Sequence, residues 1–283
     1  MVEQSQDVEV INLEENPIIN ERYSYIPSKQ SANVLFKFMG KLKYLKETLL
    51  NMAIIPRYYE EKIDYLEIDG IDKIAFPMSC FCDIHLNKLK PHMKNYGDYG
   101  IGLSKGWGIQ EGIQPIHYIN FNSKLKSDFS FALSTSLQSL SKKDREEFEI
   151  YNNLILHNLF YMKPIQGKMI FSRNKYDSRN FHDEKEWRFI PDFSGVDTEL
   201  PMVIEQEQMN PKSYDTYSLG IKSKPDLWLK FDINAIKHII VNNQSDRKEL
   251  IDFIIENKIG ENDYERYLLF SKILVFNEIG EDW

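Results

Sequence analysis

The chain has little cysteine: Cys80 and Cys82 are its two thiols among 283 residues. So few cysteines exclude a small secreted scaffold held together by disulfides, and they fit a reducing compartment. His85 and His92 follow shortly after, but no second Cys or His pair has the spacing of a metal site. We therefore predict no metal ligands, and we interpret both cysteines as small buried side chains.

The chain also lacks any apolar run of the roughly 18 residues that a membrane-spanning helix needs. Residues 1–9 include acidic side chains and lack the basic start and apolar centre of a secretion signal. These two absences predict a cytoplasmic protein without a membrane partner.

An excess of basic charge is missing as well, because 43 Asp and Glu outnumber 35 Lys and Arg, for a net charge of −8. Bulk nucleic-acid binding requires a basic surface, so direct binding to nucleic acid is not expected. Lys37, Lys41, Lys43 and Lys46 form one basic cluster. We interpret this cluster as the solvated face of a helix.

Familiar catalytic motifs are absent too. The sequence has no phosphate-binding loop, no dinucleotide-fold fingerprint and no Gly-x-Ser-x-Gly nucleophile. The glycine-rich segment 94–108 includes two glycines within 99–104 but not the rest of a dinucleotide motif. Glycines at this density allow positive φ and let another group approach the backbone closely, so a structural strand and turn stays the plainer interpretation.

What the chain does contain is a globular composition, with 42% hydrophobic and 13% aromatic residues. Its patterns predict strands or extended segments over 34–39, 54–59, 74–82, 99–103, 116–121, 168–171, 186–190, 227–231, 238–241 and 273–276. Helices are predicted over 41–52, after an Asp83 N-cap with a restart at Pro91, twice within 127–162, and over 245–257. A short turn is predicted at Trp107.

These elements predict one α+β domain over 31–283 with a central, mostly antiparallel sheet. A mobile arm over 1–30 precedes it, and a helical insertion spans about 123–163.

The strongest candidate for chemistry is the acidic segment around Glu184, Glu186 and Arg188. On a strand these three positions share one face, so two carboxylates and a guanidinium would converge. The group is either a charged sheet surface or a site in which a carboxylate, oriented by the arginine, engages a hydroxyl or a developing cation.

Five segments together resemble one protein family. Segments 54–59, 77–83, 94–108, 162–167 and 186–191 are similar, in this order, to the AbiGi family of antitoxin components of bacterial abortive-infection phage resistance. The resemblance covers roughly residues 33 to 275. It implies a protein that restrains or triggers a toxin encoded nearby.

The layout also resembles, more distantly, ADP-ribosyltransferases of the DNA-modifying toxin kind. That resemblance implies NAD as a cofactor, Lys37 at the ribose, Tyr58 near the nicotinamide and Glu186 as the catalytic acid. Lys37 departs from the family's His or Arg, because a flexible ammonium does not reproduce the hydrogen-bond geometry of those side chains. This departure favours a binding-only fold.

The further residues that we expect to bind a substrate or cofactor are Arg57, Ser79, Tyr99, Ser104 and Arg188. Three hypotheses follow: a toxin partner, an NAD-dependent ADP-ribosyltransferase, and a nucleotide sensor in which Arg57, Lys105 and Arg188 bind phosphates without chemistry.

Overall fold

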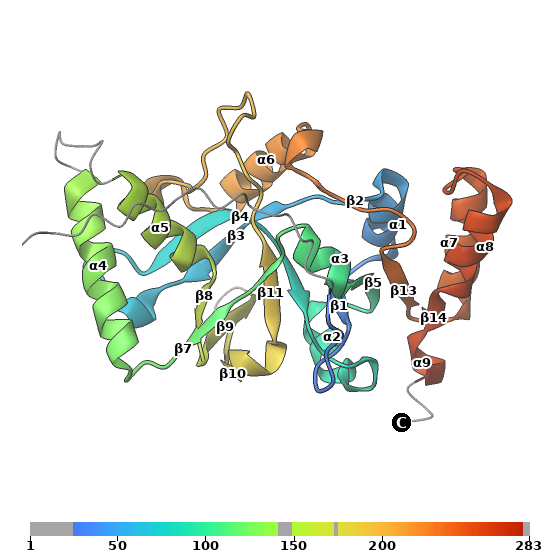
Figure 1. Ribbon diagram of the computed structural model, residues 1–283, viewed down its shortest axis with the longest axis horizontal. Coiled ribbons are helices and arrows are strands. Elements are labelled where there is room, and N and C mark those ends of the chain that lie inside the picture. Colours follow the sequence, from blue (N-terminus) through green and yellow to red (C-terminus); the bar gives the residue numbers. More distant parts are fainter. Residues whose placement is uncertain (1–24, 141–148, 173–174, 280–283) are drawn as a thin grey trace, which may run out of the picture.

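The computed structural model describes residues 25–140, 149–172 and 175–279, and a long central sheet organises them (Figure 1). Among these residues the sheet has eight strands. In spatial order they are β14 (Ile273–Val275), β13 (Ile236–Val241), β5 (Tyr99–Ser104), β1 (Val34–Met39), β4 (Lys73–Cys82), β11 (Glu186–Phe189) and β6 (Gln114–Pro115), with β3 (Arg57–Lys62) paired to β4. All neighbours are antiparallel except β13 and β14. The predicted α+β class with a mostly antiparallel sheet is confirmed.

Within the described ranges, three two-stranded sheets accompany the main sheet. They pair β2 (Ala53–Ile54) with β12 (Leu229–Lys230), β7 (His117–Ile119) with β8 (Met162–Pro164), and β9 (Gln166–Ser172) with β10 (Lys175–Asn180). The β7–β8 pair lies beside β11, because the backbone N–H of Glu186 donates to the hydroxyl of Tyr118 over 2.7 Å. This contact brings the middle of β8 next to the strand with the candidate acid.

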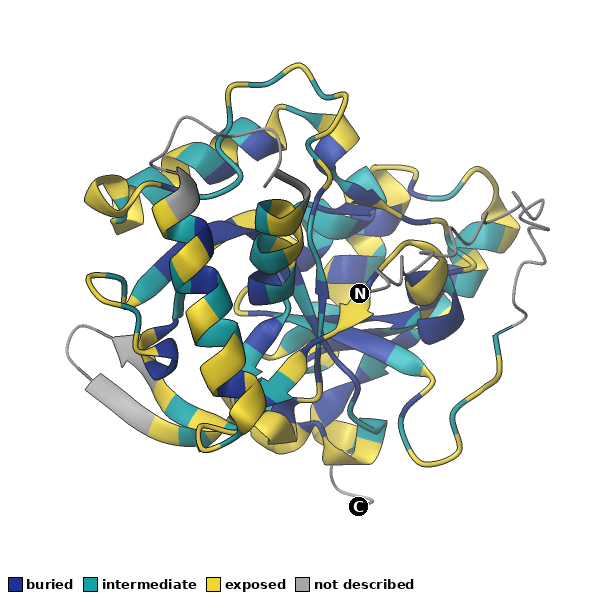
Figure 2. Ribbon diagram, turned by 60° about the vertical axis from the view of Figure 1, so that its left-hand side comes forward, coloured by how far each residue is buried: buried dark blue, intermediate teal, exposed yellow. Residues whose placement is uncertain are grey.

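Helices cover both faces of the main sheet. Side chains alternate along β1, so Leu35 packs with α1 (Leu42–Asn51) and α7 (Gln244–Glu256), while Phe36 packs with α2 (Lys90–Tyr96) and α9 (Phe276–Ile279). α8 (Asp263–Ser271) lies outside α7 at the right-hand end of Figure 1. Figure 2 shows largely buried strands beneath helices that expose their outer faces.

The other end of the sheet is covered by a helical hairpin of α4 (Lys124–Leu140) and α5 (Glu149–Phe160), at the left of Figure 1. Phe160 of α5 stacks on Phe76 of β4 with ring centroids 4.4 Å apart. α6 (Pro211–Lys222) packs on β3, and α3 (Lys105–Gln110) follows β5 directly. The 3-10 segments are η1 (Asp64–Leu66), η2 (Leu86–Lys88), η3 (Phe181–Glu184), η4 (Gln206–Gln208) and η5 (Pro225–Leu227).

None of the helices in the described ranges has both the length and the apolar character to cross a bilayer. Most of the predicted N-terminal arm, 1–30, lies outside the described residues.

Two local predictions are wrong. Asp83 does not cap a helix: residues 83–85 are irregular, and the Asp83 carboxylate accepts a hydrogen bond from the Lys105 ammonium over 2.7 Å instead. The helix begins later, as α2, with Pro91 in its first turn. Trp107 lies within α3 and not in a turn.

Candidate functional site

A central cavity of about 970 Å³ opens between the sheet, α2 and the β8–β9 segment. Its size falls in the range of small-molecule sites, roughly 300–1,000 Å³. Five lysines and five carboxylates line it, namely Lys37, Lys62, Lys73, Lys163, Lys168, Glu60, Glu61, Asp64, Glu184 and Glu186. We call it the central cavity and take it as the candidate site.

At its wall, Glu186 holds two cations. Its Oε1 accepts from Nε of Arg188 over 2.7 Å, and its Oε2 accepts from Nζ of Lys163 over 2.9 Å. Lys163 also donates to Oε2 of Glu184 over 3.0 Å. Glu184 lies in η3 and not on the strand, yet both carboxylates meet at Lys163. The predicted contact between Glu186 and Arg188 is present, whereas the predicted place of Glu184 on the same strand is wrong, and Glu184 meets Glu186 only through Lys163.

Arg188 is fully buried and uses its whole guanidinium. Besides Glu186, it donates from Nη1 to the carbonyl oxygen of Phe160 over 2.7 Å and from Nη2 to Oε2 of Glu61 over 3.0 Å. We call Glu61, Lys163, Glu184, Glu186 and Arg188 the Glu186 network. Through Arg188, the network ties β11 to β3 and to the end of α5.

Neighbouring charges determine the ionisation of Glu186 and Lys163 in this network. Burial alone would raise the pKa of Glu186, but the Arg188 guanidinium and the Lys163 ammonium hold that pKa well below its usual range. Burial would likewise lower the pKa of Lys163, but Glu186, Glu61 and Glu184 raise it well above its usual range. Glu186 is thus an ionised, immobilised anion and not a group poised to exchange protons near neutral pH.

Lys37 reaches the same cavity from another direction. β1 pairs with β5 at six positions but with β4 only at Phe36 and Cys82, so the two strands separate beyond that point. The ammonium of Lys37 lies 5.8 Å from the ring centroid of Phe81 there, and it forms no ion pair within the described chain. Burial, chiefly, lowers the pKa of Lys37.

The sheet register places Lys37 and Glu186 on opposite faces. Lys37 pairs with Ile101, on the face beneath α1, whereas Glu186 pairs with Cys82, on the face beneath α2. Both nevertheless line the central cavity. We attribute this to the separation of β1 from β4 beyond Phe36 and Cys82.

Three other predicted site residues lie away from the cavity wall. Arg57 is exposed and pairs with Asp215 over 2.9 Å. The hydroxyl of Tyr58 donates to the carbonyl oxygen of Pro201, and its ring is buried on the opposite side of β3 from Tyr59. Ser79 is fully buried, and its hydroxyl has no hydrogen-bond partner among the described residues. Their predicted binding roles stay predictions.

Tyr99 and Ser104, at the two ends of β5, also lie outside the cavity lining. The hydroxyl of Tyr99 donates to Oδ2 of Asp246 on α7 over 3.1 Å. Ser104 directly precedes α3, and its backbone N–H donates to the carbonyl oxygen of Ala235 over 2.8 Å. The structure therefore does not bring these two residues together with Glu186.

The glycines of β5 shape the cavity indirectly. A Cβ on Gly100 would lie 2.8 Å from the ring of Phe38, and one on Gly102 would lie 2.8 Å from the ring of Phe36. Both phenylalanines line the cavity. The glycines therefore let these rings lie flat on β5 and do not themselves contact the cavity.

Sequence reasoning missed Lys163 and the aromatic wall. His92 stacks on Tyr96 with ring centroids 4.4 Å apart, and the hydroxyl of Tyr96 donates to Oε1 of Glu184 over 2.5 Å. Burial lowers the pKa of His92 to about 4. The lysine in Met162–Pro164 carries no local signal of its role, because only the β7–β8 pairing delivers it to Glu186.

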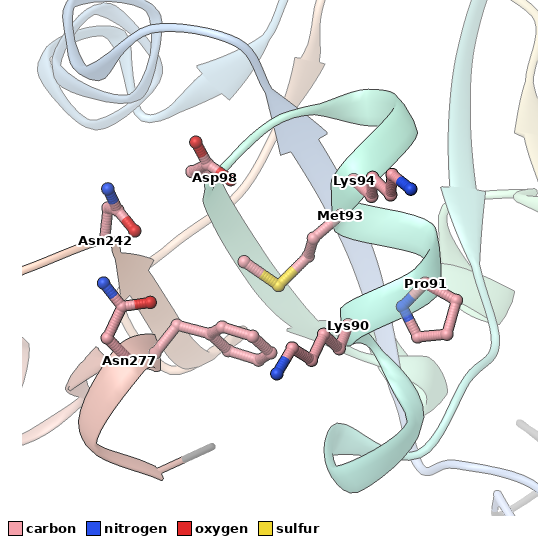
Figure 3. Close-up of a pocket in the computed structure, with 8 residues that line it drawn as sticks. Lys90, Pro91, Met93, Lys94, Asp98, Asn242 and Asn277 are labelled. Carbon is pink, nitrogen blue, oxygen red and sulfur yellow. The ribbon is translucent and has the colours of Figure 1, made fainter. Parts of the chain in front are cut away.

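A smaller cavity of about 520 Å³ lies between α2 and α9, where Figure 3 shows Lys90, Met93 and Asn277 around it. It contains none of the predicted site residues. Within the described chain, no group of three or more His, Cys, Asp or Glu is placed to hold a metal ion. Of the two cavities, the central cavity has the volume and the polar lining that an organic cofactor would need.

The comparisons with known proteins agree with the resemblance in the sequence. Residues 52–242 match the family described as "Putative abortive phage resistance protein AbiGi, antitoxin". The chain is also 35% identical over 258 residues to the abortive phage resistance protein AbiGi of Lactococcus lactis subsp. cremoris, which covers 82% of this chain and 100% of the relative. No solved structure matches. The chain belongs to the AbiGi family of abortive phage resistance proteins.

Proposed function

We propose that the chain acts in the cytoplasm as the antitoxin, or regulatory partner, of a toxin encoded nearby, through protein–protein contact. The family description supports the antitoxin role. The observation that carries the proposal is the state of Glu186, the one predicted catalytic acid. Both of its oxygens bind buried cations, which is what a structural anchor requires.

The alternative chemistry makes a different demand on this carboxylate. A glutamate that stabilises an oxocarbenium-like transition state must direct negative charge at the reacting carbon. In the Glu186 network, both carboxylate oxygens already accept hydrogen bonds, one from Arg188 and one from Lys163. The arrangement therefore favours stability of the fold over turnover.

The α4–α5 hairpin supplies a surface for partner contact. Leu125 and Phe131 of α4 are 65% and 75% exposed, and Tyr151 and Leu154 of α5 are 63% and 59% exposed. Large apolar side chains gathered on a solvent-facing element are typical of protein contact sites. Because Arg188 binds the Phe160 carbonyl, the Glu186 network also anchors this hairpin.

Co-purification tests the proposal. The tagged chain, expressed with its neighbouring genes, is expected to retain a toxin in mild salt. The double substitution Phe131→Ser and Leu154→Ser is expected to lower recovery at least tenfold. Tyr264→Ser with Tyr267→Ser on α8, where the side chains are 70% and 66% exposed, serves as the matched control. Recovery of no partner by the wild type would contradict the proposal.

A second candidate is an ADP-ribosyltransferase-like effector that cleaves NAD and modifies a macromolecule. The observation in its favour is that Lys37 and Glu186 line one cavity. Tyr59, and not Tyr58, would then face the nicotinamide, since Tyr59 lines the cavity. Labelled-NAD hydrolysis and transfer by the wild type, Glu186→Gln and the exposed control Glu205→Gln decide this candidate, and equal traces dismiss it.

The nucleotide-sensor hypothesis in its original form receives less support. Its three cations are dispersed: Arg57 pairs with Asp215 at the surface, Lys105 binds Asp83, and Arg188 lies within the Glu186 network. A nucleotide would need other donors.

A further inference from the structure

We propose that the central cavity is a binding site for a planar aromatic molecule that carries a single anionic group, with Lys37 and Tyr65 as its hydrogen-bond donors. This site goes beyond the proposed contact with a toxin and does not depend on it.

The donors in the cavity are incompletely used. Lys37 forms no ion pair or hydrogen bond with the described residues, and burial lowers its pKa. Tyr65 of η1 lines the same cavity, is 8% exposed, and its hydroxyl has no partner among the described residues. A buried donor without an acceptor carries a cost in free energy. A ligand that brings acceptors would remove this cost.

Four of the five carboxylates that line the cavity, by contrast, already accept hydrogen bonds. Glu186 binds Arg188 and Lys163, and Glu184 binds Lys163 and Tyr96. Two further carboxylates of the cavity wall also have partners. Oε2 of Glu60 accepts from both Lys73 and Tyr214, and Oε2 of Glu61 accepts from Arg188. A cation or a donor-rich ligand would have to displace one of these partners. The unpaired groups named above are therefore donors, and they favour a ligand that carries hydrogen-bond acceptors.

Aromatic side chains supply the rest of the wall. The rings of Phe36, Phe38, Tyr59, Phe81, His92, Tyr96, Phe121, Phe181 and Tyr214 line the cavity with that of Tyr65. Tyr59 is 43% exposed and can receive a ring from the open side. Aromatic faces favour stacking with a planar ligand.

Charge balance limits the ligand to one anionic group. Five lysines face five carboxylates in the lining, so the cavity has no excess of positive charge to hold a polyphosphate. Lys37, which lies against the ring of Phe81, has no carboxylate partner within 4.0 Å among the described residues, and it can neutralise one anion.

Isothermal titration with four probes tests this site: adenosine 5′-monophosphate, which has the ring and one phosphate; adenosine, the ring alone; inorganic phosphate, the anion alone; and adenosine triphosphate. The monophosphate is expected to bind at least tenfold more tightly than adenosine or phosphate, and no less tightly than the triphosphate. Lys37→Met should weaken monophosphate binding at least tenfold and leave adenosine binding unchanged. Tyr65→Phe should weaken it severalfold.

Lys88→Met and Tyr264→Phe, at exposed positions, are the matched controls and should bind like the wild type. Circular dichroism checks folding, and Lys37→Gln replaces Lys37→Met if that variant does not fold. No heat with the monophosphate, tighter binding of the triphosphate, or full binding by a folded Lys37 variant would overturn the proposal. None of these results would alter the co-purification test of the toxin partner.

Discussion

The two faces of the central sheet are built on different principles. Beneath α1 and α7, Leu35, Leu45, Ile239 and Leu250 form a continuous apolar core. On the other face, two smaller apolar clusters are separated by the central cavity, and the buried Arg188 lies beside it.

The apolar face stabilises the fold, whereas burying the charges of the other face has a cost in free energy. Apolar burial stabilises wherever shapes match, whereas each buried charge must recover its lost hydration from its partners. Apolar packing alone would be enough to stabilise the fold. We infer that the buried charges are retained for binding and for anchoring the α4–α5 hairpin.

The largest effect is expected from Arg188→Met. This change leaves the buried carboxylate of Glu186 with one cation fewer, and breaking a buried ion pair costs roughly 3–5 kcal/mol. Urea unfolding should show this loss. Arg57→Met removes an exposed pair with Asp215 and should cost less than about 1 kcal/mol. If both substitutions lowered the free energy of unfolding equally, the buried charges of the cavity face would have no special importance for stability.

On the apolar face, Leu250→Ala should lower the free energy of unfolding by roughly 2–4 kcal/mol, because Leu250 is fully buried and a cavity would remain. Ile255→Ala on the same helix is the control, since its side chain is 54% exposed, and it should change stability by less than about 1 kcal/mol. A small effect of Leu250→Ala would show that α7 contributes little to the core.

The cavity face should also respond to pH. Burial lowers the pKa of His92 from 6.5 to about 4 in the folded chain. Between these values the unfolded chain binds the proton and the folded chain does not, so stability is lost as pH falls from about 6.5 towards 4. The loss is at most about 3 kcal/mol at 1.36 kcal/mol per pKa unit.

His92→Phe keeps a ring against Tyr96 and should remove this part of the pH dependence of the unfolding free energy. His117→Phe, at an exposed position of β7, should retain it. Parallel curves for the wild type and His92→Phe would show that His92 is not responsible.

The smallest effect concerns the start of α7. The side-chain oxygen of Asn243 accepts from the backbone N–H of Asp246 over 3.0 Å. Asn243→Ala removes this N-cap and should cost about 1 kcal/mol. Asn257→Ala, at the C-cap of the same helix, should cost less. A thermal melt that ranks them in reverse would contradict this assignment.

Much of the fold could be predicted from local patterns. β1, α1, β4, β5, β13 and α7 follow the predicted segments within a few residues, because each combines a clear periodicity with recognisable ends. The Asp83 helix failed for a reason that lies far away in the chain: Lys105 takes the carboxylate that would have formed the cap.

The site was predicted less well than the fold. Strand alternation identified the contact of Glu186 with Arg188, but it could not show that Glu184 and Glu186 share Lys163, which arrives through the parallel pairing of β7 and β8. Nor could it place Lys37 in the cavity, because that depends on where β1 leaves β4. Long-range strand pairing decides both positions.

The most direct test of the central claim is growth of cells that express the neighbouring toxin with this chain. We predict that the wild type restores growth, that a folded Glu186→Gln variant also does so, and that Phe131→Ser with Leu154→Ser does not. Growth arrest caused by the chain alone and abolished by Glu186→Gln would contradict the account and indicate an enzyme.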